Sequence, residues 1–430
     1  MKVLFINPAQ PKIEQLQEVE KLPPLGLAYL AAVLENNGIQ VDIHDDYLLQ
    51  WEQDNTVKLA QQYDIVGITG LTATSLVAIE LAKRLKNKFL ICGGAHATLF
   101  PKQMIEHFDA VVLGEGEKVI VDIVKNRRRG IIQGQRTENL DTLPMPARHK
   151  LRLTQYPLQN EFLQAKRVFS MNTSRGCPFN CQFCSVKTIW GREYRAFSPQ
   201  RVAEEIKFLV DNYQATGIYF REDNFTFDRN RVIGICERIR TWGLEWVCES
   251  RVEHLDELLI SIMADAGCKG MWFGTESGSN RVLKMLHKGV KKERAVETFR
   301  LCKKHGIRTG ASFILGIPGE SKAEMYETLN FAHILDSYWT WFNYYLGIPG
   351  SDLYDKVIKE KLYDRLDERK YAWVRVDGMS SNEMIEFHRL IKLLYLCKKP
   401  QRLWRALTET SPKTWIIALL KMAKVYKARL

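Results

Sequence analysis

Short apolar runs alternate with longer amphipathic stretches along most of this 430-residue chain. In the first part of the chain the pattern predicts strands at 2–8, 39–45, 63–71, 89–94 and 108–117. Helical periodicity separates several of these strands, at 24–38, 76–87 and 118–126. Pro24 near the start of the first helix and Gly38 at its end are typical helix boundaries. Strands that alternate with helices favour an α/β fold with a doubly wound, Rossmann-like parallel sheet.

A second alternating region follows a segment without a clear period. The segment 131–165 includes the sequence LPMPAR and is predicted to be a linker. Strands are then expected at 167–176, 217–223, 244–251, 270–277, 308–317 and 339–348. Helical patterns intervene, for example at 199–213, 255–267 and 292–306. Six such units indicate a partial (β/α)6 TIM-like barrel, whose active site lies at the carboxyl ends of the strands.

The chain is therefore divided into four parts, 1–130, 131–165, 166–370 and a helical, basic C-terminal region at 371–430. Residues 411–430 combine an apolar stripe with lysines, a pattern that suits either a helix docked on the barrel or one lying on an anionic membrane. The first residues are expected to form a strand and not a signal peptide, and no apolar run approaches the roughly 20 residues of a membrane span. We expect a cytoplasmic protein, with peripheral membrane contact through 411–430 as the alternative.

The formal net charge of +12 changes this picture little. Nucleic acid, an anionic membrane, an acidic ligand or a solvated basic surface would each account for it. The chain has no recognisable RNA-binding appendage, so a nucleic-acid partner is not expected. The nine cysteines form an odd set, and in a reducing compartment they are expected to be free or metal-bound.

Three of these cysteines, Cys177, Cys181 and Cys184, lie within the sequence SRGCPFNCQFCS at 174–185. They follow a predicted strand, in a loop that also holds glycine and proline. A structural zinc ion wants four protein ligands, and no fourth Cys or His is near in sequence. Iron–sulfur clusters are held by cysteine thiolates, and three of them would leave one iron of a 4Fe–4S cluster open to a substrate or cofactor.

The sequence CPFNCQFC resembles the CxxxCxxC motif of the radical S-adenosylmethionine (SAM) enzymes. The resemblance implies that the three cysteines hold a 4Fe–4S cluster, that the open iron binds SAM, and that SAM is cleaved to a 5′-deoxyadenosyl radical. A reductase, flavodoxin or ferredoxin would supply electrons. Positions that match the SAM-contacting segments of the family are Phe183, Glu222, Asp223, Ser250, Arg251 and Glu276.

The first region resembles the cobalamin-binding domain of one radical SAM subclass. The matching segments include INPAQP, GITGLTATS, GGAHATLFP and VVLGEGE. On this resemblance the cobalamin candidates, mostly in loops at strand ends, are Asn7, Thr69, Gly70, Thr72, Thr74, Ser75, Gly93, Gly94, His96, Gly114, Glu115 and Gly116. An Asp-x-His-x-x-Gly motif, whose His ligates cobalt in other cobalamin modules, is absent here and in the subclass.

The two domains together imply radical C-methylation of an unactivated carbon in a small-molecule or lipid-like substrate. Cobalamin-assisted oxidation, cyclisation or ring rearrangement without methyl transfer is the alternative within the same class. An RNA-modifying radical SAM enzyme and a non-catalytic cobalamin carrier fit less well, because a carrier has no use for an open cluster. The sequence does not identify catalytic residues beyond the cofactor contacts.

Overall fold

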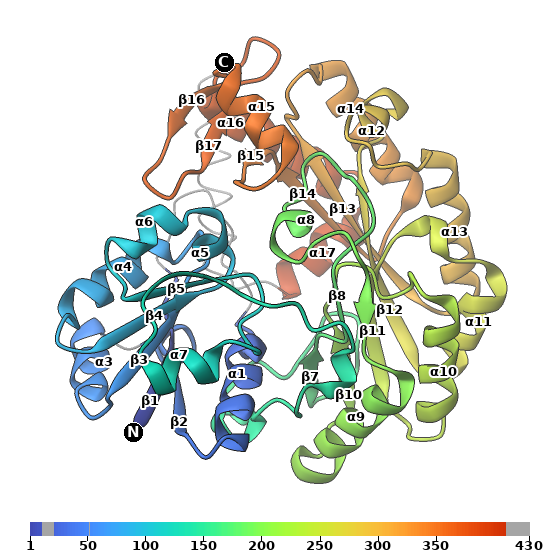
Figure 1. The fold of residues 1–430 in the computed structure, drawn as a ribbon. Coiled ribbons are helices and arrows are strands. Elements are labelled where there is room, and N and C mark those ends of the chain that lie inside the picture. The colour runs from blue at the N-terminus through green and yellow to red at the C-terminus, as the bar shows by residue number, and fades with distance from the viewer. Residues whose placement is uncertain (11–20, 51, 410–430) are drawn as a thin grey trace.

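The computed structural model describes residues 1–10, 21–50 and 52–409 (Figure 1). The amphipathic segment 411–430 lies outside the described residues. Two parallel six-stranded sheets dominate the molecule, one in each half of the chain. This arrangement confirms the expected α/β class, with a Rossmann-like sheet followed by a barrel-like sheet. Among the described residues, no helix has both the length and the apolar character needed to cross a bilayer.

The first sheet has the strand order β2-β1-β3-β4-β5-β6, with every neighbouring pair parallel. Its strands are β1 (Lys2–Asn7), β2 (Gln40–Asp45), β3 (Ile65–Thr69), β4 (Phe89–Gly93), β5 (Ala110–Leu113) and β6 (Gly130–Gln133). Helices cover both faces: α1 (Leu25–Asn36), α2 (Asp46–Leu49), α3 (Gln53–Ala60), α4 (Ser75–Arg84), α5 (Ala95–Leu99), α6 (Pro101–Ile105) and α7 (Ile120–Asn126). Alternate residues of β1 enter two separate cores, Val3 and Phe5 on one face and Leu4 and Ile6 on the other.

The second sheet has the order β14-β13-β12-β11-β10-β7, also parallel throughout. Its strands are β7 (Val168–Met171), β10 (Gly217–Phe220), β11 (Glu245–Ser250), β12 (Cys268–Glu276), β13 (Arg308–Leu315) and β14 (Trp339–Tyr344). The helices outside it are α9 (Pro199–Tyr213), α10 (Arg229–Ile239), α11 (Glu257–Asp265), α12 (Asn280–Met285), α13 (Lys292–Lys304) and α14 (Lys322–Leu335). The predicted order of six β/α units is therefore confirmed.

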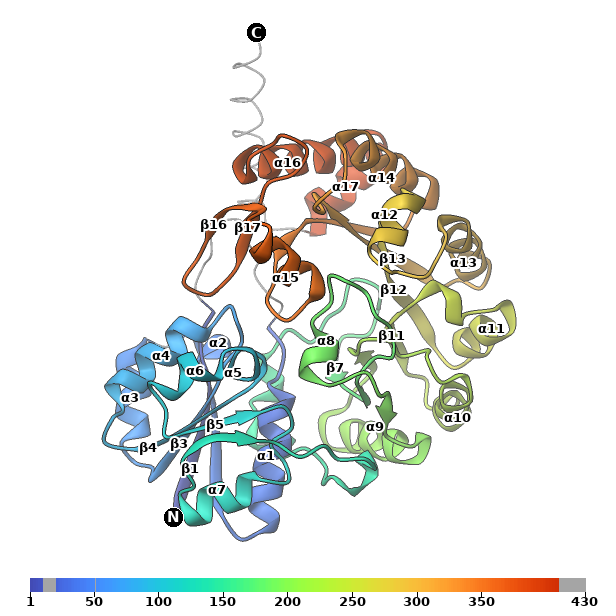
Figure 2. The ribbon, with the colours of Figure 1, turned by 45° about the horizontal axis from the view of Figure 1, so that its top comes forward.

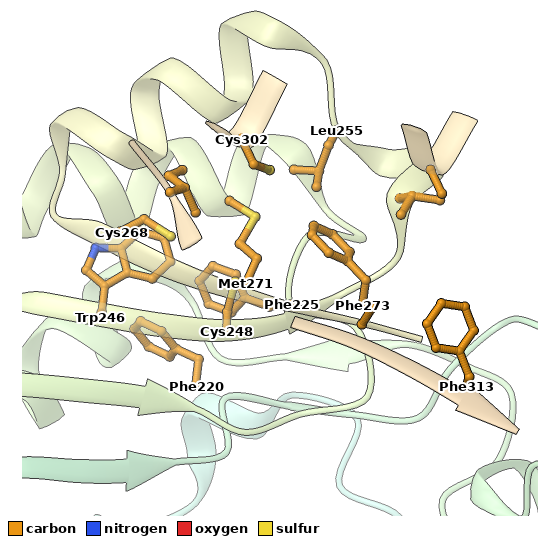
Figure 3. Close-up of a cluster of buried hydrophobic side chains, with 14 of the residues drawn as sticks. Phe220, Phe225, Trp246, Cys248, Leu255, Cys268, Met271, Phe273, Cys302 and Phe313 are labelled. Atoms are coloured by element: carbon orange, nitrogen blue, oxygen red, sulfur yellow. The ribbon is translucent and has the colours of Figure 1, made fainter. Parts of the chain in front are cut away.

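Side chains on the outer face of the second sheet form the main core against these helices. Phe220, Trp246, Phe273 and Phe313 belong to it, and Figure 3 shows them with neighbouring cysteines. Cys248 is fully buried in this core, as expected for a small apolar residue. Alternation along the strands leaves the opposite residues to line the inner face of the barrel.

The inner face is closed at its floor by aromatic side chains. Phe162, which is fully buried, packs edge-on against Trp272 with ring centroids 5.2 Å apart. Glycines make room for these rings, since a Cβ on Gly310 would lie 2.2 Å from the Trp272 ring and one on Gly270 would lie 2.5 Å from Phe162. The rings of Phe162 and Trp272 therefore fill this part of the inner face.

Several elements were not predicted from the sequence. Strand β6 lies partly in the expected linker segment. A two-stranded hairpin, β8 (Ser174–Arg175) with β9 (Arg195–Ala196), flanks the short helix α8 (Val186–Ile189). A small antiparallel sheet of β15 (Leu346–Gly347), β17 (Ala372–Val374) and β16 (Tyr363–Leu366) follows the barrel, with the helix α15 (Asp352–Lys359). The helices α16 (Ser381–Cys397) and α17 (Pro400–Glu409) lie in the C-terminal region that the sequence analysis expects to be helical.

The additional elements also contact the first domain. Figure 2 shows α15 and the small sheet beside α5 and α6. The loop before α15 comes so close to α5 that a Cβ on Gly350 would lie 2.6 Å from the Leu99 side chain. A buried ion pair joins the linker to the barrel, where Nη2 of Arg148 lies 2.7 Å from the Glu205 carboxylate.

Candidate functional site

The three clustered cysteines lie in a loop whose two ends are adjacent, because they are paired as short strands. We call residues 176–194 the cysteine loop. It is bounded by the β8–β9 hairpin, in which Arg175 pairs in register with Arg195. Gly176, with φ of +82°, opens the loop, and a Cβ there would lie 2.3 Å from the Glu193 carbonyl oxygen. The turn therefore requires glycine at this position, and it places the loop beyond the carboxyl end of β7.

The thiols are held in a partly buried environment beside an arginine. Cys181 is buried, while Cys177 and Cys184 are half-buried. Nη1 of Arg251 lies 3.3 Å from Sγ of Cys181, and the guanidinium stacks 3.9 Å from the Phe179 ring centroid. Burial raises the pKa of Cys184 to about 11, and the nearby Asp223 carboxylate and the other two thiols add to this increase. A bound metal must therefore displace protons from these thiols.

Arg251 connects the cysteine loop with a strained residue at the end of β12. Its Nη2 donates to the carbonyl of Lys288, whose Nζ lies 2.8 Å from Oε1 of Glu276. Glu276 is buried and has φ of +60°, at an irregularity in the pairing with β13. A non-glycine residue in this conformation is uncommon and often marks a functional position. The structure thus connects two of the predicted SAM contacts, Arg251 and Glu276, to Cys181.

The other predicted SAM contacts lie in different environments. Glu222 is buried and accepts hydrogen bonds from the hydroxyls of Thr173 and Ser174, which lie just before Arg175 and the cysteine loop. Asp223 is accessible to solvent, yet surrounding protein atoms and repulsion from the carboxylates of Glu249 and Glu222 raise its pKa to about 6.

The side chains of two further residues that were predicted to contact SAM are in contact with other parts of the protein. The Ser250 hydroxyl is buried and lies 2.5 Å from the Thr226 hydroxyl. Phe183 is partly buried and packs against the main core.

Sequence reasoning missed several residues that fix the cysteine loop. The Gln182 backbone N–H donates to Leu286 over 2.9 Å, and its side chain lies 3.1 Å from Nδ1 of His287. Nζ of Lys187 lies 2.5 Å from the carboxylate of Asp352 at the start of α15. These partners are distant in sequence, so only the tertiary structure brings them to the loop.

The predicted cobalamin residues gather at the carboxyl edge of the first sheet. Gly70 donates its N–H to the Gly93 carbonyl over 2.7 Å, so the loops after β3 and β4 pack together. Gly94, with φ of +103°, leaves no room for a side chain, because a Cβ would lie 3.0 Å from the Gly70 oxygen. Thr69 ends β3, and Leu71, which the sequence analysis did not single out, is exposed on the same loop.

The hydroxyls of this edge already have local partners. Ser75 donates to the Thr72 carbonyl over 3.0 Å, and the Thr74 hydroxyl lies 3.3 Å from the Leu71 N–H, so both stabilise the turn before α4. Thr72 is also buried.

The side chains of three further cobalamin candidates already have partners within the protein. His96 is fully buried, with Nε2 3.3 Å from Oε1 of Gln103, so its side chain is not exposed at the carboxyl edge of the first sheet. The Asn7 amide donates to Asp45 over 2.9 Å. Glu115 is buried and bonded to two arginines of the second domain. Gly114 and Gly116, which flank Glu115, remain at the edge, where Gly114 has φ of +68° and space for a Cβ.

The inner face of the barrel combines a polar wall with an aromatic one. On the polar side the Tyr219 hydroxyl donates to Oε1 of Glu249 over 2.7 Å. Glu249 pairs in register with Trp272, whose ring lies 5.6 Å from that of Trp341 on β14. The Trp341 side chain is 42% exposed although it lies on the concave face of the sheet. A ligand in the barrel would therefore meet both hydrogen-bonding groups and an indole ring.

Comparisons with known proteins agree with this geometry. Residues 171–332 match the radical SAM superfamily, and residues 19–124 match the B12 binding domain. An uncharacterized methyltransferase of Pyrococcus horikoshii is 32% identical over 87% of this chain and 87% of its own length. The chain belongs to the cobalamin-dependent radical SAM enzymes.

Other relatives of this radical SAM enzyme have different named reactions. The cytidylyl-2-hydroxyethylphosphonate methyltransferase of Streptomyces wedmorensis is 27% identical over 84% of this chain and 83% of its own length. An anaerobic magnesium-protoporphyrin IX monomethyl ester cyclase of Rubrivivax gelatinosus is 28% identical over 90% of this chain and 76% of its own length. Family membership therefore does not decide between methylation and cyclisation.

Solved structures show the same fold. The cobalamin-dependent SAM radical enzyme OxsB, with aqua-cobalamin and SAM bound, superimposes with a TM-score of 0.74 at 15% identity, covering 99% of this chain and 71% of that one. The radical SAM methyltransferase TsrM of Kitasatospora setae, with cobalamin and a 4Fe–4S cluster bound, gives 0.65 at 17% identity, covering 85% of this chain and 79% of that one.

This radical SAM enzyme uses a 4Fe–4S cluster, SAM and cobalamin, and the residues present fit those groups. Among the described residues no three His, Cys, Asp or Glu side chains are arranged to hold one metal ion. Three thiolates that bind three different irons of a cluster do not need such an arrangement. At the other edge, the glycine turns and the exposed Leu71 offer backbone and apolar surface to a flat macrocycle.

Proposed function

We propose that this enzyme methylates an unactivated carbon of a small molecule by a radical mechanism. The observation that carries the proposal is the contact between the two cofactor-binding edges. Glu115, at the carboxyl edge of the first sheet, bonds to Arg175 and Arg195 at the two ends of the cysteine loop. The helix α5 of the first domain also packs against α8 of the cysteine loop. A substrate carbon near this junction would be within reach of both cofactors.

The cofactors supply radical hydrogen abstraction and a transferable methyl group when they are bound. In the proposed reaction a C–H bond of the substrate is replaced by a C–CH3 bond. The hydrogen leaves in 5′-deoxyadenosine, methionine is released from that SAM, and the methyl group comes from a second SAM, which leaves S-adenosylhomocysteine. An external reductase, flavodoxin or ferredoxin supplies the electrons that balance these steps.

The residues of this chain would act by holding and orienting the reactants. Cys177, Cys181 and Cys184 would hold the cluster, and Arg251 would hydrogen-bond the sulfur of Cys181, as it does now over 3.3 Å. Asp223, which is accessible beside the thiols, is the better candidate for the SAM amino group, because the Glu222 carboxylate already binds Thr173 and Ser174.

The inner face of the barrel would receive the substrate. Trp341 and Trp272 offer a surface for a ring or an apolar chain, while Glu249 and Tyr219 offer hydrogen-bonding groups. The substrate class that fits is an amphipathic small molecule, including lipid-like molecules with a polar group. The aromatic floor formed by Phe162 and Trp272 would limit how deeply it enters and exclude water below the reacting carbon.

The experiment uses the full chain reconstituted anaerobically with iron, sulfide and hydroxocobalamin. The holoenzyme is incubated with a chemical reductant, SAM deuterated in its methyl group, and a small-molecule extract of the native cells. Methylation predicts a product that carries the deuterated methyl group, together with equal amounts of 5′-deoxyadenosine and S-adenosylhomocysteine. A substrate-derived product formed with 5′-deoxyadenosine but without the label would contradict methylation.

Cyclisation without methyl transfer is the second candidate, and the similarity to the Rubrivivax gelatinosus cyclase favours it. The same incubation separates the two, because a cyclase would form 5′-deoxyadenosine and a product without added carbon. S-adenosylhomocysteine would then not accumulate in proportion to the product.

A further inference from the structure

A buried ion cluster joins the first domain to both ends of the cysteine loop. We call Glu115, Glu117, Arg175 and Arg195 the neck cluster. Oε2 of Glu115 lies 2.8 Å from Nη1 of Arg175 and 3.1 Å from Nη1 of Arg195. Oε1 of Glu117 lies 2.5 Å from Nη2 of Arg175. All four side chains are at most 10% exposed, and their formal charges cancel.

The two arginines stand where the cysteine loop begins and ends. Arg175 and Arg195 are register partners in the β8–β9 hairpin, and Cys177 is two residues after Arg175. One carboxylate from the first domain therefore holds both ends of the loop. Nη1 of Arg195 also donates to the Thr137 carbonyl over 2.6 Å, and the Thr137 N–H donates to Glu115 over 3.2 Å. The neck of the loop is thus fixed to two segments of the first half of the chain.

Packing holds the Arg175 guanidinium in one orientation. It lies over the ring of Tyr29 at 5.8 Å and over that of Trp190 at 5.2 Å. Tyr29 belongs to α1 of the first domain, and Trp190 belongs to the cysteine loop itself. A planar guanidinium bonded by two carboxylates and flanked by two rings has little freedom, which lysine would not reproduce.

We propose that Glu115 and Glu117 are positioning residues that hold the cysteine loop, through Arg175 and Arg195, in the geometry that presents the cluster to SAM. The inference rests on the proposed assignment of the three cysteines to the cluster. It replaces the expectation that Glu115 contacts cobalamin. Removing one carboxylate charge leaves an arginine charge buried without its partner, and such changes disturb structure more than the loss of an exposed pair. Partners one step removed from metal ligands commonly tune the metal site.

The chain offers a matched control in the same loop. Glu193 pairs with Arg136 over 3.1 Å, but these two side chains are 65% and 38% exposed. Glu193→Gln therefore removes one carboxylate charge from the same interface without burying an unpaired arginine. Exposed pairs of this kind contribute little to stability.

The test compares Glu115→Gln, Glu117→Gln and Glu193→Gln in the full chain, each reconstituted with iron, sulfide and hydroxocobalamin. Five quantities are measured: iron per chain, cobalt per chain, the EPR spectrum of the reduced cluster, the change in that spectrum on adding SAM, and the rate of SAM cleavage without substrate. We expect the first two variants to keep cobalamin, to alter the SAM-dependent EPR change, and to lose roughly 10- to 100-fold in SAM cleavage. Glu193→Gln should match the unaltered protein.

Two results would overturn the proposal. The first is unaltered EPR spectra and cleavage rates in both Glu115→Gln and Glu117→Gln. The second is loss of cobalt with a normal cluster spectrum, which would return Glu115 to a role in cobalamin binding. If Glu115→Gln does not fold, Glu117→Gln decides alone. None of these readouts depends on methyl transfer, so failure of the methylation proposal would remain distinguishable.

Discussion

The guanidinium of Arg251 lies 3.3 Å from Sγ of Cys181 and stacks 3.9 Å from the Phe179 ring centroid. A donor and a positive charge beside a cluster sulfur stabilise the more negative, reduced state of an iron–sulfur cluster. Arg251→Met should therefore lower the midpoint potential of the cluster. An EPR-monitored redox titration measures this shift. Arg229→Met, which removes a more exposed arginine paired with Asp256, is the control, and equal potentials in all three proteins would contradict the prediction.

The assignment of the three loop cysteines to the cluster predicts how each substitution changes the iron content. Each of Cys177→Ala, Cys181→Ala and Cys184→Ala should lose most of the about four irons that a cubane cluster holds. Cys397→Ala removes an exposed cysteine at the end of α16 and should retain the cluster. Iron and sulfide analysis with the visible absorption spectrum measures the outcome. Full iron retention in any of the three loop variants would exclude that residue as a ligand.

Adjacent residues of β14 should separate stability from substrate binding. Phe342 is 2% exposed on the outer face and stacks on Phe313 with ring centroids 5.3 Å apart, whereas Trp341 is 42% exposed on the inner face. Phe342→Ala should lower the free energy of unfolding by about 3–5 kcal/mol. Trp341→Ala should lower it by less than about 1 kcal/mol. Urea denaturation under anaerobic conditions compares them, and equal losses would mean that Trp341 also belongs to the core.

Trp341→Ala should also reduce substrate turnover while leaving SAM cleavage without substrate unchanged. The reason is that the exposed indole is proposed to contact the substrate and not the cluster. Trp341→Phe keeps a ring at this position and should recover part of the turnover. Loss of SAM cleavage in Trp341→Ala would contradict this division of roles.

The buried carboxyl group of Glu320 should make the free energy of unfolding depend on pH. Its carboxylate is 1% exposed and accepts the N–H groups of Gly316 over 2.7 Å and Ile317 over 3.1 Å. Burial raises its pKa from the ordinary 4.5 to about 7, with added repulsion from Glu324 and opposition from the two N–H groups. Between pH 4.5 and about 7 this carboxyl group is protonated in the folded state and ionised in the unfolded state. The free energy of unfolding that this residue contributes therefore falls as pH rises.

The change Glu320→Gln should remove that dependence, because the amide resembles the protonated acid. Relative to the unaltered protein, the variant should gain roughly 3 kcal/mol between pH 4.5 and 7, with no further change above. Urea denaturation of the apoprotein at several pH values measures the difference. Glu327→Gln, at an exposed position of the helix α14 that follows Glu320 in the chain, is the control. A constant difference across the pH range would show that Glu320 titrates normally.

The sequence was sufficient for most of the fold because the main elements have strong local signals. Helix α9 occupies the predicted 199–213, since the Ser198 side chain caps it and Pro199 begins it. Strand β6 escaped prediction because its four residues, next to a run of arginines, make too short an apolar pattern. The β8–β9 hairpin has only two residues in each strand, so it exists through its tertiary partners.

The site was predictable only where its chemistry is local in sequence. The spacing of Cys177, Cys181 and Cys184 placed the loop. Arg251 was expected to contact SAM, but its hydrogen bond to Cys181 joins residues 70 positions apart. Glu115 lies between two glycines near the end of a predicted strand, where an accessible loop residue would be expected. Its partners Arg175 and Arg195 lie 60 and 80 positions away. Burial and pairing of charges at a domain junction leave no local signal.

The register pairing of Arg175 with Arg195 means that the cysteine loop begins and ends at neighbouring positions of the fold. Its two ends stay together whatever the length of the chain between them, so inserting or deleting a residue at an exposed position of the loop need not shift β7 before it or α9 after it. A change in the length of the loop would therefore be absorbed within the loop and its contacts at Gln182 and Lys187, while β7 and α9 keep their positions.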